Sequence, residues 1–310
     1  MVPNGEPVRV TKQGFEMRKI HMFLAGGAGV VLVLIGLVLW TREHPDTLFP
    51  VRVNDRWGYI SKSAKIVVPA QFENAQPFSD GLAAVETGNR WGYINNQGKM
   101  VVAPQFDMAD PFSDGLAVVG SGPRLGYIDK SGRYVINPQF EGAGRFGSNL
   151  APVLVNGRWG YIDRKGRVAI NPQFGEAGSF SDGRAVVGVA GNYGYIDEKG
   201  KTVIVPQFSS AGDFHDGLAV IRMGGRSGYI DKSGKVKINP QFDAAGDFSG
   251  GLAVVSVGGR YGYIDRSGSF VINPQFDSAG AFHAGLAPVW ISGRRGYIDK
   301  QGKYVWNPAG

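Results

Sequence analysis

Seven arginines recur at one position of a regular 34-residue spacing, which could give the protein a row of guanidinium groups. Planar guanidinium groups bind carboxylates and phosphates well, because two N–H donors can face two acceptor oxygens. One interpretation is that each arginine bonds loop carbonyls or a recurrent aspartate of an adjacent unit. The other is a basic rim, a docking column for an acidic partner or for lipid head groups. The column consists of Arg56, Arg90, Arg124, Arg158, Arg226, Arg260 and Arg294, with Asn192 in the eighth place.

The remaining polar residues do not have the spacing of a catalytic or metal site. His21 and His44 flank an apolar segment, while His215 and His283 each replace a serine of a recurring loop. A recurring turn, Asp129-Lys130-Ser131-Gly132, has one carboxylate beside a lysine, whereas a calcium loop needs alternating acidic ligands. Its Asp and Gly are instead typical of a tight turn. We therefore predict no enzyme activity, no metal and no cofactor.

Five aromatic residues form a second column, one position after the arginines. They are Trp57, Trp91, Trp159, Tyr193 and Tyr261. Such rings could act as platforms for sugars, or they could pack between neighbouring sheets. We favour packing, so we do not expect a small-molecule ligand.

These columns belong to a tandem repeat, because Gly-Tyr-Ile occurs eight times, 34 residues apart at every step. A constant period without insertions indicates one small β unit that is copied and stacked on its neighbours. Pro-Gln-Phe and Ala-x-x-Phe segments recur in the same register, so that eight units extend over residues 48–308. The motif glycines, which we predict to be structural, are Gly58, Gly92, Gly126, Gly160, Gly194, Gly228, Gly262 and Gly296.

One unit, residues 82–115, shows what the repeat is expected to form. Residues 82–85, 90–94 and 99–103 are apolar, aromatic or β-branched and are separated by turn residues, which predicts a three-stranded antiparallel meander. The connection 105–115 contains two phenylalanines, which should pin it to the core. The fold class is thus all-β. Eight such sheets could close into a β-propeller-like ring or wind as an open β-solenoid.

The glycine of Gly-Tyr-Ile interrupts an otherwise bulky strand in all eight units. A glycine inside a strand often marks a place where another backbone comes close. We therefore expect a neighbouring sheet to approach the strand there, leaving no room for a side chain.

The segment Gly157-Arg158-Trp159-Gly160-Tyr161-Ile162-Asp163, followed by Gly166 and Asn171-Pro172-Gln173-Phe174, resembles the bacterial WG-repeat family, also called KWG repeats. The resemblance covers residues 48–308. The tryptophan for which the family is named occurs only at Trp57, Trp91 and Trp159. The other repeats have Leu125, Tyr193, Ser227, Tyr261 and Arg295 at this position. The resemblance implies a non-catalytic interaction module and brings no catalytic residues.

The N-terminal part has a different composition, because residues 22–40 contain no charge and are rich in Val, Leu, Gly and Ala. A helix of that length spans roughly 28 Å, close to the thickness of a bilayer core. A cleavable signal peptide would have a shorter apolar region and a small-residue cleavage site. We predict an uncleaved transmembrane helix over residues 22–40, which contacts the lipid bilayer and is followed by a linker, 41–47, and the repeat domain, 48–310.

Basic residues flank the predicted span unequally: four precede it and Arg42 alone follows closely. The positive-inside rule then places residues 1–21 in the cytoplasm and the repeat domain on the other side of a bacterial inner membrane, in the periplasm or otherwise outside the cytoplasm. Ala25, Gly29 and Gly36 lie near one line along such a helix, where another helix could pack closely. The alternative is ordinary use of glycine in a membrane helix.

The overall charge is +7, and the repeat region contributes only a small basic surplus over its length. Nucleic-acid binding requires a denser basic face, so we exclude it. The sequence favours a single-pass scaffold or accessory subunit that contacts other subunits of a membrane protein complex. The alternative is a cell-envelope receptor that binds glycan or peptide on the repeat surface.

Overall fold

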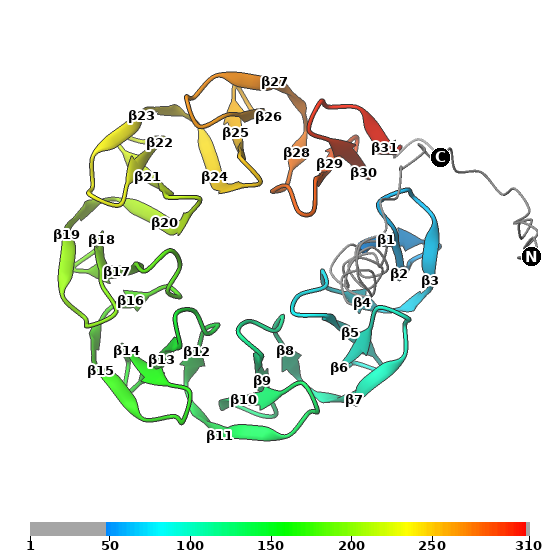
Figure 1. Cartoon of the computed structure of the whole chain (residues 1–310), viewed down its shortest axis with the longest axis horizontal. Coiled ribbons are helices and arrows are strands. Elements are labelled where there is room, and N and C mark those ends of the chain that lie inside the picture. The colour runs from blue at the N-terminus through cyan, green and yellow to red at the C-terminus, as the bar shows by residue number, and fades with distance from the viewer. Residues whose placement is uncertain (1–47, 308–310) are drawn as a thin grey trace, which may run out of the picture. The chain divides into compact units, whose positions relative to one another are not determined.

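The structure, a computed structural model, describes residues 48–307. This part of the chain forms eight antiparallel sheets, which follow one another around a ring as the blades of a β-propeller (Figure 1). Of the two predicted architectures, the repeats therefore adopt the closed ring and not the open solenoid. Within residues 48–307 no helix is long and apolar enough to cross a membrane. The predictions for residues 1–21, 22–40 and 41–47, including Ala25, Gly29 and Gly36, lie outside the described residues.

The blades have these strands. Blade 1 contains β1 (Phe49–Val53), β2 (Arg56–Ile60) and β3 (Ile66–Phe72). Blade 2 contains β4 (Asn74–Ala75), β5 (Leu82–Thr87), β6 (Arg90–Asn95) and β7 (Met100–Phe106). Blade 3 contains β8 (Met108–Ala109), β9 (Leu116–Gly120), β10 (Leu125–Asp129) and β11 (Tyr134–Phe140). Blade 4 contains β12 (Gly142–Ala143), β13 (Leu150–Val155), β14 (Arg158–Asp163) and β15 (Val168–Phe174). Blade 5 contains β16 (Glu176–Ala177), β17 (Ala185–Val189), β18 (Asn192–Ile196) and β19 (Thr202–Phe208). Blade 6 contains β20 (Ser210–His215), β21 (Leu218–Met223), β22 (Arg226–Asp231) and β23 (Val236–Phe242). Blade 7 contains β24 (Ala244–Ser249), β25 (Leu252–Val257), β26 (Arg260–Ile264) and β27 (Phe270–Phe276). Blade 8 contains β28 (Ser278–Ala279), β29 (Leu286–Ile291), β30 (Arg294–Asp299) and β31 (Tyr304–Trp306).

Seven blades have four strands, which corrects the predicted three-stranded unit. The additional strand lies inside the predicted connection and is innermost in its blade (Figure 1). In blade 3, for example, Met108 pairs with Gly120 and Ala109 with Val119. Most of these inner strands are two residues long, which is too short to show alternation in the sequence.

The two faces of the ring carry different turns, because successive strands are antiparallel. One face, which we call the hairpin face, carries the short turns between the two middle strands of each blade and the crossovers to the next blade. The opposite face, the loop face, carries the Asp-x-x-Gly turns and the loops that follow the inner strands. The arginine column lies on the hairpin face, since each arginine stands at the start of a middle strand.

The repeated glycine is a close-packing residue, but its neighbour is the next strand of its own sheet and not another sheet. A Cβ atom on Gly92 would lie 2.5 Å from the carbonyl oxygen of Val102 and 2.8 Å from the nitrogen of Pro104. The register between β6 and β7 shifts at this point, so that the Pro-Gln segment bulges toward the glycine. The glycine and the Pro-Gln-Phe motif are thus two halves of one local structure.

The core consists of eight clusters, each lying between two neighbouring blades. The Gly-Tyr-Ile motif contributes to the clusters on both faces of its blade, because successive side chains of a strand point to opposite faces. Tyr93 packs toward blade 3, where it meets Ile128 of the same motif one repeat later. The Tyr93 hydroxyl also donates a hydrogen bond, 2.8 Å long, to the carbonyl oxygen of Asp110 in the next blade. Burial raises the pKa of Tyr93, so this hydroxyl remains a donor.

The ring closes between blade 8 and blade 1 with a modified set of contacts. In the other interfaces the tyrosine meets a phenylalanine, as where Tyr59 and Phe78 lie edge to face with centroids 4.9 Å apart. At the closure, Phe49 of blade 1 takes that place beside Tyr297, at 5.3 Å, although the equivalent position in later blades is alanine. The Tyr297 hydroxyl donates to the carbonyl oxygen of Pro50 at 2.9 Å. These contacts join the first repeat to the last.

Candidate functional site

Five arginines of the column pair with a carboxylate on the crossover to the next blade. The acid stands 17 residues after the arginine, immediately after the phenylalanine of Pro-Gln-Phe. The five pairs are Arg56–Glu73, Arg90–Asp107, Arg124–Glu141, Arg226–Asp243 and Arg260–Asp277. About half of each arginine side chain remains exposed.

Each acid also binds the hairpin of the following blade, so it bridges two blades. Glu141 lies 3.4 Å from Arg124 of blade 3, and its other oxygen accepts a hydrogen bond from the backbone N–H of Gly157 in blade 4, at 3.2 Å. The hydrogen bond from Gly157 is the main reason why the pKa of Glu141 lies below its usual value, and Arg124 adds to it. We call such an arginine, acid and hairpin N–H an inter-blade clamp.

Two column arginines have no clamp. The crossover residue that would pair with Arg158 is Gly175, and for Arg294 residues 48–307 contain no residue at the corresponding position. No hydrogen bond or ion pair joins either guanidinium to another residue of the range 48–307. The structure thus divides the column into five arginines that bind within the ring and two that have no ion pair within residues 48–307.

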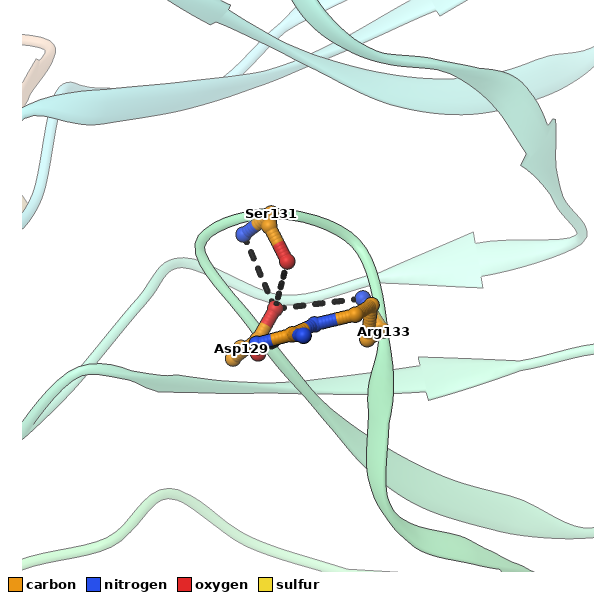
Figure 2. Close-up of polar contacts among 3 residues, drawn as sticks. All are labelled: Asp129, Ser131 and Arg133. Atoms are coloured by element: carbon orange, nitrogen blue, oxygen red, sulfur yellow. Dashed lines mark hydrogen bonds and ion pairs between the residues drawn. The ribbon is translucent and has the colours of Figure 1, made fainter.

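The Asp-x-x-Gly turns are held by their own side chains, as the sequence predicts. Figure 2 shows Asp129, whose Oδ1 accepts hydrogen bonds from the backbone N–H groups of Ser131, at 2.9 Å, and of Arg133, at 3.1 Å. The Ser131 hydroxyl also donates to it, and the Arg133 guanidinium lies 3.0 Å from Oδ2. These hydrogen bonds lower the pKa of Asp129 to about 2, and the bond from the Ser131 hydroxyl has the largest effect. Both carboxylate oxygens of Asp129 are therefore bound by groups of the turn itself.

The remaining sequence candidates for chemistry do not converge on one place. Within residues 48–307 no group of three or more His, Cys, Asp or Glu side chains could hold a metal ion. His215 lies 3.6 Å from Asp247, whereas His283 contacts the ring of Phe49 at the closure of the propeller. The two histidines therefore belong to different surroundings.

The aromatic column packs between blades instead of forming exposed platforms. Trp91 and Trp159 lie half-buried against two of the inter-blade clusters. The ring of Trp159 covers Gly142 of its own inner strand, where a Cβ atom would lie 2.9 Å from the indole. Tyr193 donates its hydroxyl to Glu176 at 2.7 Å. The column thus fills space between neighbouring sheets.

Sequence reasoning missed an acidic pair on the inner strands, Asp213 of β20 and Asp247 of β24. Partial burial raises the pKa of both carboxyl groups; for Asp213 the charge of Asp247 raises it further, whereas His215 lowers it. In the other repeats the same position is Pro77, Pro111, Arg145, Ser179 or Ala281, so the available signal was an aspartate at this position in two consecutive repeats. That the two carboxyl groups influence each other became apparent only from the inner strands, β20 and β24, that carry them.

The repeat motifs are matched by a family model described as WG containing repeat. It fits residues 57–91, 91–120, 126–159, 159–193, 193–226, 228–261 and 261–289. The chain belongs to the WG-containing repeat family. This confirms the resemblance seen in the sequence, and a WG-repeat propeller of this kind fits a protein-interaction or other binding role.

Solved structures share the fold of this WG-repeat protein at low sequence identity. Dihydro-heme d1 dehydrogenase NirN, solved in complex with DHE, is 12% identical, with 85% of this chain and 73% of that chain covered and a TM-score of 0.56. A eukaryotic initiation factor is 12% identical, with 84% and 83% covered and a TM-score of 0.51. Hsv2p of Kluyveromyces lactis is 9% identical, with 73% and 92% covered and a TM-score of 0.51. A comparison with curated proteins finds no match.

Proposed function

We propose that this protein is a membrane-anchored, non-catalytic scaffold or accessory subunit of a larger membrane protein complex. In this proposal the WG-repeat propeller docks other subunits in the periplasm of a bacterium, while residues 22–40 form the anchor. The observation that carries the proposal is that, within residues 48–307, neither Arg158 nor Arg294 on the hairpin face has a clamp.

The clamps explain why most of the arginine column is needed for the ring itself. An arginine that already faces a carboxylate offers a partner less charge than one without such a neighbour. Within residues 48–307 no side chain pairs with the guanidinium group of Arg158 or Arg294, and a planar guanidinium group is well suited to a carboxylate of another protein. A charged contact of this kind contributes mainly to orientation and association rate.

The ring also has the stiffness that a docking platform needs. Each blade contributes one side of two apolar clusters, and such a cluster also joins blades 8 and 1. Loops on such a scaffold can vary without loss of the core. The membrane part of the proposal rests on the uncharged segment 22–40 and its unequal basic flanks.

The test is co-purification of the tagged full chain in mild detergent, with partners identified by mass spectrometry. We expect Arg158→Glu combined with Arg294→Glu to lower the yield of specific partners severalfold, with an unchanged melting temperature. The matched control is Arg226→Ala, which removes a clamped arginine of the same column. Wild-type partner yield in the double variant would contradict docking through these two residues, and a chain that purifies alone would contradict the complex.

Protease protection tests the orientation separately. Protease added to intact spheroplasts should degrade the propeller while an N-terminal tag survives, because the basic flank precedes residues 22–40. A fully protected propeller would instead place the repeat domain in the cytoplasm.

A further inference from the structure

One blade lacks the large side chain that fills the other inter-blade interfaces. The column position is Trp in three repeats, Tyr in two, Leu125 and Arg295 in two others, and serine only at Ser227. Ser227 lies on β22, paired with Arg222 of β21 on one side and with Phe242 of β23 on the other. It is buried, with 5% of its surface exposed, so a small polar residue here occupies a place that normally holds a ring.

A cavity of about 160 Å³ lies at this place, between blades 6 and 7. Its walls include Ser210, Ile221 and Ser227 of blade 6 and Ala245 of blade 7. Ser210 is the counterpart, two repeats later, of Gly142, the residue that the indole of Trp159 covers in blade 4. The cavity is therefore the volume that the column side chain fills in other blades.

The neighbouring contacts keep this volume open. The Arg226–Asp243 clamp joins blades 6 and 7 directly beside it, and Arg222 donates a further hydrogen bond, 3.4 Å long, to the carbonyl oxygen of Asp243. Clusters of buried apolar side chains around Tyr195 and Tyr229 hold the two sides of blade 6. Tightly packed surroundings relax only partly around a missing side chain, so a void remains.

Size and chemistry of the cavity select its ligand. An apolar protein cavity of about 150 Å³ takes up benzene. Here Val220 and Ala245 provide apolar walls, while Ser227 and Ser210 provide hydroxyl groups that can accept a hydrogen bond from an indole N–H. Arg222 lines the mouth, where a guanidinium group can lie over an aromatic face.

We propose that this cavity binds one aromatic ring, presented as a tryptophan side chain of a partner polypeptide. The mouth faces the hairpin side, where Ser210 and Arg222 are exposed, which is the face that carries Arg158 and Arg294. The inference deepens the proposed function, because a buried aromatic anchor beside charged contacts is the usual composition of an interface hot spot. It depends on the proposed function only in assigning the aromatic side chain to a partner polypeptide.

Binding can be tested without any partner, with N-acetyl-tryptophanamide and free indole as probes. Calorimetric titration of the full chain in mild detergent should show saturable binding of both probes at one site. Ser227→Trp should weaken it at least tenfold, because the new side chain occupies the cavity. Thr202→Trp, which adds an indole at an exposed position of β19, should bind like the wild type and controls for uptake by detergent.

The filling variant should also be more stable. Ser227→Trp is expected to raise the melting temperature by about 2–4 °C, as cavity filling commonly does. Ser227→Tyr gives a second variant whose residue already fits this position in blades 5 and 7, and it should block binding in the same way.

Three results would overturn the proposal. Absence of binding of both probes to the wild type would show that the cavity takes no ring. Equal binding by the folded Ser227→Trp or Ser227→Tyr variant would place the site elsewhere. Binding of free indole without N-acetyl-tryptophanamide would exclude a polypeptide source. None of these results changes the co-purification test, so the two proposals fail independently.

Discussion

Single residues of the repeat act through backbone geometry more than through side-chain chemistry. Within residues 48–307, seven of the eight glycines of Gly-Tyr-Ile face a bulge of the next strand, and the Asp of Asp-x-x-Gly closes its own turn, as Asp129 does. Both roles recur because the period of 34 residues repeats the Gly-Tyr-Ile motif eight times and the Asp-x-x-Gly turn six times. Substitutions at these positions should therefore affect stability before they affect any surface.

Gly194→Val should destabilise the propeller strongly. A Cβ atom at this position would lie 2.4 Å from the carbonyl oxygen of Ile204 and 2.6 Å from the nitrogen of Pro206, and a backbone bulge cannot move aside easily. We expect the free energy of unfolding to fall by about 3 kcal/mol or more, measured by urea denaturation. The control is Val205→Thr on the adjacent bulge, an exposed position that should change it by less than about 0.5 kcal/mol. Equal effects of the two substitutions would contradict the close contact.

Asp129→Ala and Asp129→Asn should differ. Asparagine keeps the backbone hydrogen bonds of the turn, as Asn95 does in blade 2, where its Oδ1 accepts from Gln97 and Lys99. Alanine loses them, which should cost about 1 kcal/mol in thermal or urea unfolding. Identical losses for both variants would show that charge, and not turn closure, is the main contribution.

The same carboxylate gives a pH dependence with a defined sign. Because the folded-state pKa of Asp129 is lowered to about 2, the native state binds fewer protons than the unfolded state between that value and the unfolded pKa near 4. The stabilisation is complete above about pH 4 and decreases as the pH falls toward 2. Asp129→Asn should remove this part of the acid dependence in melting curves, and an unchanged curve would contradict the assignment.

At the scale of elements, the blades are joined by apolar clusters inside and by clamps on the hairpin face. Clamps occur at five of the eight interfaces, and Gly175 and Ser209 interrupt them between blades 4 and 6. Exposed ion pairs are worth little individually, so the clusters provide most of the stability and the clamps mainly fix the hairpins.

Arg226→Ala should therefore lower the free energy of unfolding by up to about 1 kcal/mol, because it breaks a clamp between blades 6 and 7. Arg158→Ala should change it by less than about 0.5 kcal/mol, because no pair is lost. Both are measured by urea denaturation at low and high salt, and the Arg226 effect should shrink at high salt. A larger effect of Arg158→Ala would mean that the unclamped arginine stabilises the ring.

At the scale of the whole propeller, closure depends on residues that break the repeat. Phe49 stands where other blades have alanine, and Arg295 of blade 8 lies over Trp57 of blade 1, 5.6 Å from the ring centroid. Leu286 and Val51 complete this cluster. Within residues 48–307 no strand is shared between the first and last blades, so this cluster is what holds blade 8 to blade 1.

Phe49→Ala should open this interface more readily than an equivalent change elsewhere. Loss of a buried phenylalanine costs about 3–5 kcal/mol, and here the loss falls on the contact that holds the first blade to the last. We expect hydrogen exchange to increase selectively in β1, β2 and β30. Phe214→Ala, inside the ring between blades 5 and 6, is the control and should destabilise without that pattern. Equal exchange patterns would show that closure is no weaker than any other interface.

Sequence periodicity alone determined the all-β fold, the number of units, the turn chemistry of Asp129 and the need for glycine at Gly92, because each of these depends on residues close together in the chain. Only the tertiary structure decided the rest. The inner strands pair over so few residues that no pattern marks them, and the clamps join residues of three separate turns. Ring closure joins residues such as Pro50 and Tyr297 from opposite ends of the domain. The cavity at Ser227 depends on what is missing from the space between two sheets, which a linear pattern does not measure.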